Sequence, residues 1–170
     1  SVTSIGRSAF SGCTMLDQIT IPDSVKSVGR NAFSGCSLLS QITILSSLNE
    51  IKKFCFKECK SLKRISLPNS LKMIEYGAFY GCSSLEKISI PSSVSEIESK
   101  SFYGCSSLTK ISILSPNIEI GKGVFNGCKI VSLSKNMTNI PSNMFKKCTS
   151  LTQITIPSSV KSICEYAFYG

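Results

Sequence analysis

The sequence predicts a solenoid of stacked, similar units, each of which contributes a strand to one parallel sheet. Phenylalanine recurs with a period of 23 residues that is broken once by an interval of 20. A cysteine lies three residues after each of the first seven of these phenylalanines. In every unit, two columns of Ile, Leu or Val alternate with polar residues, as in a strand with one buried face. The phenylalanines are Phe10, Phe33, Phe56, Phe79, Phe102, Phe125, Phe145 and Phe168.

The strand of each unit carries the pattern Leu-x-x-Ile-x-Ile, as in Leu85, Ile88 and Ile90. This is the strand signature of leucine-rich repeats, whose units run to about 20–29 residues. One unit cannot bury its apolar columns alone, so the units must stack. The predicted fold is therefore a leucine-rich repeat solenoid of 23-residue repeats, with the parallel β-sheet on its concave wall.

The rest of the unit predicts the convex side. A proline often ends the strand, and a second apolar pair such as Val94 and Ile97 follows it as a short extended piece or a tight turn. The pair Ala78-Phe79, with Cys82 three residues on, suits one 3₁₀ or helical turn. Gly81 could end that turn in the left-handed conformation. We therefore expect short 3₁₀ or helical turns and extended pieces on the convex side.

Residues 1–170 are expected to form a single array of about seven repeats. Both ends fall inside a unit, so we expect the chain to be a fragment of a longer protein. The unit that begins at Cys128 is three residues short, and Val131 and Leu133 match the strand columns when it is aligned from its far end. Pro116 and Asn117 also depart from the pattern. Residues 114–140 are therefore predicted to be irregular, through either a local change of curvature or simple drift.

Composition excludes several function classes. With 42% apolar and 17% charged residues the chain is not a disordered tail, and no apolar run is long enough to insert into a membrane. The formal net charge of +9 favours acidic partners. Histidine, the commonest general base and metal ligand, is absent, and the serines form no Gly-x-Ser-x-Gly motif. We therefore expect no enzyme, no cofactor and no metal site.

Seven of the nine cysteines occupy one column of the repeat. Side chains stacked in one column point the same way, which disfavours disulfides between them. The column is therefore predicted to be a ladder of buried thiols that pack as small hydrophobic residues. Cys164 takes the slot of Gly6 and is expected to be the most exposed thiol. The column consists of Cys13, Cys36, Cys59, Cys82, Cys105, Cys128 and Cys148.

The strand residues that point away from the core are the candidate binding site. One outward column reads Gln18, Gln41, Arg64, Lys87, Lys110, Ile130 and Gln153. The next is a continuous series of hydroxyl residues that includes Ser66, Ser89 and Ser112. The concave wall is the usual binding face of such solenoids, so Arg64, Lys87 and Lys110 are the strongest candidates for contact with an acidic partner. Both columns also suit ordinary solvated strand surface.

Three further features lie off this wall. A second basic cluster, mostly on the turn side, comprises Lys52, Lys53, Lys57, Lys60, Lys63 and Arg64, and such lysines often serve only solubility. Tyr80, Tyr103 and Tyr169 follow the column phenylalanine, where each could contact a partner or pack on the next turn. Asn136-Met137-Thr138 is a glycosylation sequon. The strand columns offer no aromatic platform, so nucleic acid is not an expected partner.

The complete unit reads Cys-x-x-Leu-x-x-Ile-x-Ile-Pro-x-x-Val-x-x-Ile, followed by Ala-Phe-x-Gly-Cys. Over the whole chain it resembles the BspA-like, Treponema pallidum-type leucine-rich repeats of anaerobic bacteria, spirochaetes and parasitic protists such as Trichomonas. The resemblance implies a cell-surface or secreted adhesion protein with no catalytic motif. Its implied partner is a host matrix or cell-surface protein, whereas the positive net charge makes a glycosaminoglycan a second candidate. A structural spacer and an intracellular scaffold or inhibitor remain alternatives.

Overall fold

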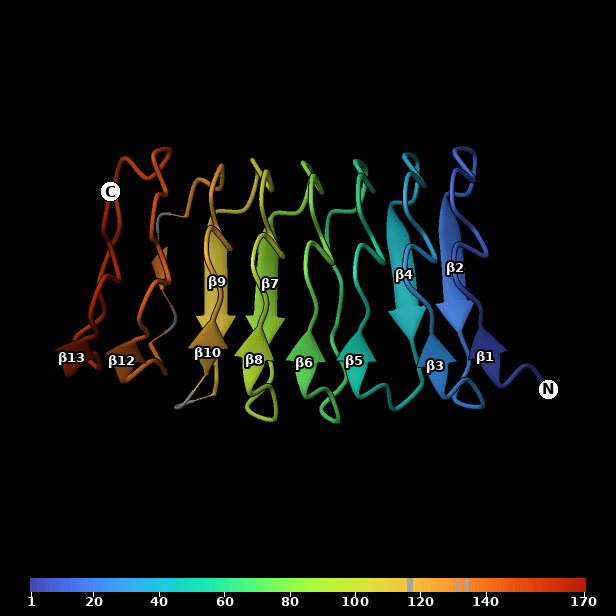
Figure 1. The fold of residues 1–170 in the computed structure, drawn as a ribbon, viewed down its shortest axis with the longest axis horizontal. Helices are drawn as coiled ribbons and strands as arrows, with labels where there is room; N and C mark the ends of the chain where they lie inside the picture. Colours follow the sequence, from blue (N-terminus) through green and yellow to red (C-terminus); the bar gives the residue numbers. More distant parts are fainter. Residues whose placement is uncertain (116–117, 131, 134) are drawn as a thin grey trace.

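The repeats stack side by side into an elongated solenoid (Figure 1). This computed structural model describes residues 1–170 except 116–117, 131 and 134. All strand pairs among the described residues are parallel, and paired residues such as Gln18 and Gln41 lie one 23-residue repeat apart in every pair except β9 and β11, where the offset is 22 residues. The predicted repeat solenoid with its parallel sheet is therefore confirmed.

One wall of the solenoid is built from the predicted strand motif. Its apolar residues point inward, so Ile88 and Ile90 are buried while Lys87 and Ser89 are exposed. The pairing divides this wall into the sheet β2–β4 and the sheet β7–β9–β11. The strands of this wall are β2 (Gln18–Ile21), β4 (Gln41–Ile44), β7 (Lys87–Ile90), β9 (Lys110–Ile113) and β11 (Ser132–Leu133).

A second wall of two-residue strands runs in the opposite direction to the first (Figure 1). The second residue of each unit's second apolar pair lies on these strands, as Ile74 does after Leu71 and Ile97 after Val94, and both isoleucines are fully buried. The extended alternative for this segment is therefore the one observed. The strands are β1 (Ser4–Ile5), β3 (Ser27–Val28), β5 (Glu50–Ile51), β6 (Met73–Ile74), β8 (Glu96–Ile97), β10 (Glu119–Ile120), β12 (Asn139–Ile140) and β13 (Ser162–Ile163).

The turn side contains hydrogen-bonded turns but no 3₁₀ or α-helix within the described residues. In the second repeat, the N–H of Ser34 donates to the carbonyl of Asn31, whereas the N–H of Phe33 donates to the backbone carbonyl of Cys55 in the next repeat. Asn31 and Gly35 both have positive φ, at 55° and 76°. A left-handed residue every four positions prevents a helix from continuing, so alternate N–H groups bond to the neighbouring repeat instead.

The column phenylalanines form a continuous stack along the solenoid axis. Neighbouring rings from Phe10 to Phe125 lie 5.1–5.6 Å apart between centroids and within 14° of parallel. Phe125 and Phe145, which flank the short repeat, are 6.0 Å apart and tilted by 40°. The interior thus continues through the short repeat at a changed angle.

The short repeat joins its predecessor in a register that the sequence did not predict. Ser132 pairs with Lys110 and Leu133 with Ile111, so Leu133 fills the second apolar slot instead of the third. Ile130 is only 1% exposed, so its predicted place in the outward column was wrong. The predicted alignment was made from the far end of the unit, where Ser132 does lie opposite Thr155. Val131, Pro116 and Asn117 lie outside the described residues.

Candidate functional site

We define the long-strand face as the outward side of β2, β4, β7 and β9 together with residues 64–66. Gln18 lies opposite Gln41, which lies opposite Arg64, and Lys87 lies opposite Lys110. All five side chains are exposed, so the fold forms two in-register groups, one of Gln18, Gln41 and Arg64 and one of Lys87 and Lys110. Of the other predicted binding residues, Ser112 is half-buried and three are exposed: Ser66, Ser89 and Gln153.

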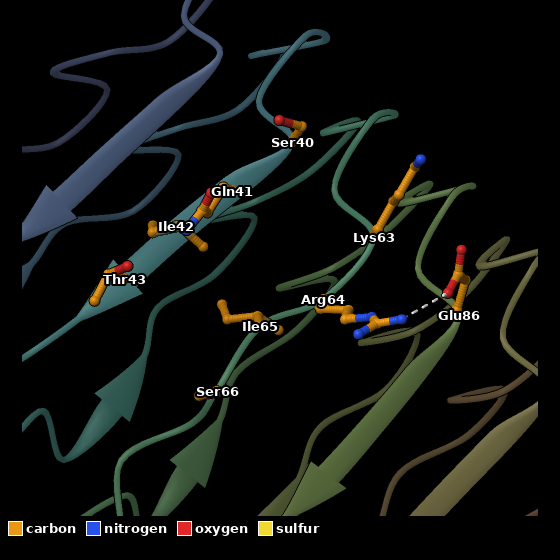
Figure 2. A pocket seen from close by; sticks show the side chains of 9 residues that line it. All are labelled: Ser40, Gln41, Ile42, Thr43, Lys63, Arg64, Ile65, Ser66 and Glu86. Atoms are coloured by element: carbon orange, nitrogen blue, oxygen red, sulfur yellow. Dashed lines mark ion pairs between the residues drawn. The ribbon is translucent and has the colours of Figure 1, made fainter.

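The two groups are separated by an opening in the wall that the sequence did not predict. At residues 64–67 the only pairing is the single bridge between Gln41 and Arg64. A cleft of about 620 Å³ lies there (Figure 2). Its lining residues are Ser40, Gln41, Ile42, Thr43, Lys63, Arg64, Ile65, Ser66 and Glu86.

The cleft has a cationic side with one acidic neighbour. Nη2 of Arg64 lies 3.8 Å from Oε2 of Glu86, and these side chains are 68% and 49% exposed. An ion pair this exposed contributes at most about 1 kcal/mol. Lys63 is also exposed at the rim (Figure 2). Arg64 can therefore exchange Glu86 for a partner carboxylate at little cost.

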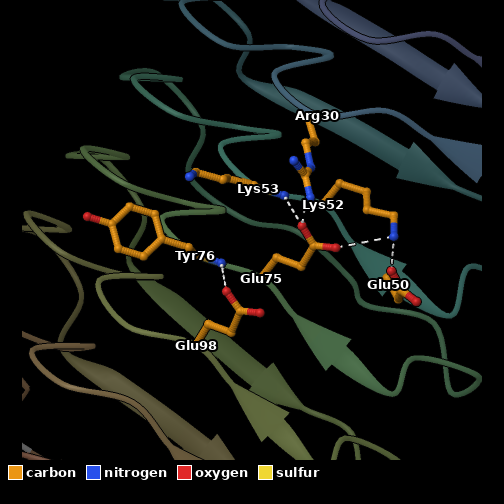
Figure 3. A network of polar contacts seen from close by, with 7 residues as sticks. All are labelled: Arg30, Glu50, Lys52, Lys53, Glu75, Tyr76 and Glu98. Carbon is orange, nitrogen blue, oxygen red and sulfur yellow. Dashed lines mark hydrogen bonds and ion pairs between the residues drawn. The ribbon is translucent and has the colours of Figure 1, made fainter.

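Behind this wall, Glu75 organises a polar network on the turn side (Figure 3). Its Oε2 accepts a hydrogen bond of 2.8 Å from the backbone N–H of Lys53, and its Oε1 lies 3.2 Å from Nζ of Lys52. Burial alone would raise the pKa of Glu75, but the Lys53 N–H and the Lys52 ammonium together hold it below its usual value. Lys52 also pairs with Glu50. These groups satisfy one another, which indicates a structural role.

The cysteine column forms a hydrogen-bonded ladder next to the phenylalanine stack. Each buried thiol donates to the carbonyl of the phenylalanine 26 residues earlier, at sulfur–oxygen distances of 3.0–3.2 Å, from Cys36 through Cys128. Burial raises the pKa of Cys59 and Cys82 well above the usual thiol value, and that of Cys148 to about 12. Cys59 and Cys82 therefore remain protonated at neutral pH, and their thiols donate across consecutive repeats.

All nine cysteines are free thiols, and they differ in exposure. Cys55 is fully enclosed beside the ladder. Cys164 is half-buried, whereas Cys13 is exposed, so the expectation that Cys164 would be the most exposed thiol was wrong. Cys13 belongs to the first repeat, whose Phe10 ring stacks on Phe33 of the second.

Two other sequence features have clear positions. Tyr80 and Tyr103 stack on each other with ring centroids 5.0 Å apart, so they pack between neighbouring turns while remaining half-exposed. In the sequon, Asn136 and Thr138 are exposed and Met137 is buried. All three line a hollow of about 170 Å³.

Within the part of the chain that the structure describes, no three His, Cys, Asp or Glu residues are grouped to hold a metal ion. No helix in the described residues has the length and hydrophobicity needed to cross a bilayer.

One protein-family model matches the chain from end to end. The model for the BspA type leucine rich repeat region, in 6 copies, matches residues 1–105 and 73–170. A crystal structure of the Treponema pallidum leucine-rich repeat protein is 30% identical with a TM-score of 0.66, over 95% of this chain and 66% of that one. A leucine-rich repeat protein from Bacteroides ovatus is 31% identical with a TM-score of 0.62, over 99% of this chain and 56% of that one. The chain thus spans less than two thirds of the length of either protein. It matches none of the curated proteins.

Proposed function

Because the chain belongs to the BspA-type leucine-rich repeat family, we propose that it is a cell-surface or secreted module that binds a partner protein and catalyses no reaction. The long-strand face is its binding surface. A repeat solenoid suits this role because its rigid wall presents one side chain per repeat at fixed spacing. The absence of histidine from the sequence is consistent with a role without general acid–base chemistry.

The observation that carries this proposal is the exposed cationic group of Arg64, Lys87 and Lys110 beside the cleft. Lys87 and Lys110 stand in register on paired strands, and Arg64 lines the cleft one repeat away. Their backbones are fixed by the solenoid, so a partner would not have to order them on binding. The cleft gives a partner side chain a recess to enter, which a flat strand surface lacks.

The chemistry of the face favours a partner with clustered carboxylates. Near the cleft, Glu86 is the acidic side chain that lines it, and its pairing with Arg64 is weak. An acidic segment could replace Glu86 at Arg64 and reach Lys87 and Lys110. We infer that this segment belongs to a host matrix or cell-surface protein, which makes the module an adhesin.

The test compares two triple variants with the same change in charge. The first, Arg64→Glu with Lys87→Glu and Lys110→Glu, reverses the long-strand face. The matched control, Lys26→Glu with Lys72→Glu and Lys161→Glu, reverses three exposed lysines that precede the short strands β3, β6 and β13. Binding to purified matrix proteins and to epithelial cells is measured at low and at physiological salt.

We expect saturable binding at physiological salt that the first variant loses and the control retains. Equal losses in the two variants would show that only the total charge matters. Saturable binding that survives in both variants would place the protein-binding site away from the long-strand face. In either case the proposal for this face would fail.

A further inference from the structure

A second cationic surface lies on the turn side, away from the long-strand face. We call it the turn-edge patch and define it as Lys53, Phe54, Lys57, Tyr76, Tyr80 and Tyr103. From it we propose that the protein has a separate site for a linear sulfated polysaccharide. This goes beyond the proposed protein-binding function and rests on different residues.

The patch holds its lysines on aromatic rings. Nζ of Lys53 lies 5.4 Å from the centre of the Phe54 ring and 5.1 Å from that of Tyr76. Nζ of Lys57 lies 5.3 Å from the Phe54 ring and 5.9 Å from the Tyr80 ring. Each ammonium therefore spans two rings that belong to neighbouring repeats. Figure 3 shows Lys53 and Tyr76 extending to the same side, away from Lys52 and Glu50.

Several cations near this patch pair with carboxylates, unlike Lys53 and Lys57. In the described chain, ion pairs to carboxylates engage Arg30, Lys52, Lys60 and Arg64, whereas Lys53 and Lys57 take part in none of them. Glu58, the residue next to Lys57, pairs with Lys60 instead. A carboxylate neutralises an ammonium, but a ring positions it without cancelling its charge. The patch thus presents two full positive charges with limited freedom.

The backbone of Phe54 supports this arrangement. Phe54 has a φ of +56°, which a bulky residue rarely adopts. Its ring occupies space above Gly77, where an added Cβ would lie 2.4 Å from the ring. The glycine one repeat later therefore makes room for the ring on which both lysines rest. The strained backbone places an aromatic platform at the edge that a glycine or asparagine in this column would not provide.

A lysine held between two rings recurs further along the edge, although both rings there belong to one repeat. Lys146, which occupies the column of Lys57, lies 5.1 Å from the Tyr166 ring and 5.6 Å from the Tyr169 ring. Tyr166 occupies the column of Phe54 and also has a positive φ, of 58°. Exposed Lys100 and Lys122 stand on the intervening turns. Ring-supported and free cations therefore follow one another along the axis of the solenoid.

A linear polyanion matches this edge better than a compact acidic site would. Its charges repeat along a chain, as the cations do along the repeats. The half-exposed tyrosines supply apolar ring surface for sugar C–H groups and hydroxyls for sugar oxygens. Strong acid groups such as sulfates stay ionised and bind ammonium groups as acceptors. A sulfated polysaccharide combines these features in one ligand.

The experiment measures binding of a heparin oligosaccharide of defined length by calorimetry at physiological salt. The test variant is Lys53→Gln with Lys57→Gln, and the control with the same charge change is Lys72→Gln with Lys161→Gln, two exposed lysines outside both proposed sites. We expect the test variant to lose about tenfold in affinity, which corresponds to about 1.4 kcal/mol, and the control to lose less than about twofold. Tyr80→Ala with Tyr103→Ala should weaken binding although it leaves the charge unchanged. Thermal melting checks that each variant is folded.

Three results would overturn the proposal. Equal losses in the test variant and the control would mean that heparin responds to total charge alone. Unchanged affinity for desulfated heparin would remove sulfate as the recognised group. Equal affinity for a single-stranded DNA of the same charge would assign the patch to polyanions in general. Protein binding that depends on Arg64, Lys87 and Lys110 is unaffected by any of these results, so the two proposals fail separately.

Discussion

The third repeat and the two that follow it have the same interior but different outer walls. Around Arg64 the long-strand wall is reduced to one bridge, whereas β7 and β9 pair over four residues. Inside, the ring distances hardly differ, at 5.3 Å between Phe56 and Phe79 and 5.1 Å between Phe79 and Phe102. The hydrogen bonds from the thiols of Cys59 and Cys105 to phenylalanine carbonyls are also alike, with sulfur–oxygen distances of 3.1 and 3.2 Å.

This comparison indicates that the interior ladders hold the repeats together and that the outer wall can open without disturbing them. The opening is where the cleft and the cations of the candidate site lie. The short-strand wall also stays continuous there, since β5, β6 and β8 pair in one sheet. A site can thus form on one wall while the core and the other wall keep the register.

The strongest test of this view removes a ring from each region. Phe56 and Phe102 are fully buried in equivalent positions, one beside the opening and one in the paired region. Phe56→Ala and Phe102→Ala should each cost about 3–5 kcal/mol, because both leave a cavity in the same stack. For a chain of this size the melting temperature should fall by roughly 6–20 °C. Calorimetry of both variants provides the measurement.

Phe168→Ala serves as the control. Because Phe168 is 38% exposed, this substitution should reduce stability much less. If the paired strands hold the solenoid instead, Phe56→Ala will be far more destabilising than Phe102→Ala. That outcome would contradict the view that the interior holds the stack.

The features that could be predicted from the sequence are those determined by apolar residues that recur at the same buried position of every repeat. The period, the strand motif and the solenoid follow from Phe, Leu and Ile positions that recur in every unit. The opening at residues 64–67 could not be predicted, because Leu62, Ile65 and Leu67 fit the motif as well as their neighbours do. Pairing depends on how closely adjacent repeats approach, which a column pattern does not record. The register at Ser132 was predicted wrongly for the same reason. Ser132 pairs with Lys110 on one side and with Thr155 on the other, and the two pairings place it in different columns.

The cysteine ladder runs through both regions, and alkaline pH should weaken it in both. Unfolded thiols ionise near pH 8.5. Burial raises the pKa of Cys59 and Cys82, so the native state keeps protons that the unfolded state releases. The contribution of these thiols to stability is therefore constant below about pH 8, and it falls as the pH rises further, by up to about 1.4 kcal/mol per pH unit for each such thiol. Melting temperatures between pH 6 and pH 10 give the curve.

The variant Cys59→Ala with Cys82→Ala separates this effect from other titrations. It should melt at a lower temperature at pH 7, because the carbonyls of Phe33 and Phe56 lose their thiol donors. Its stability should then fall less steeply above pH 9. A slope unchanged from that of the parent protein would show that the thiols do not cause the alkaline loss.

The smallest predicted effect concerns the turn edge of the third repeat, where Phe54 rests over Gly77. Gly77 and Gly123 both have positive φ, at 59° and 63°, but a Cβ added to Gly123 would meet only Asn126, at 4.0 Å. Gly123→Ala should therefore lower the free energy of unfolding only by the penalty for an alanine in the left-handed conformation, about 1 kcal/mol. Gly77→Ala should cost about 1 kcal/mol more, because the methyl group displaces the Phe54 ring.

A double-mutant cycle with Phe54→Ala isolates this contact. With the ring removed, Gly77→Ala should cost no more than Gly123→Ala in chemical denaturation. If the extra cost persists, the Phe54 ring does not occupy the space above Gly77. The two lysines would then lack the platform assigned to them, so this cycle tests the geometry of the turn-edge patch without any ligand. Because Gly77→Ala should shift the ring while leaving every charge in place, it should also weaken heparin binding more than Gly123→Ala does.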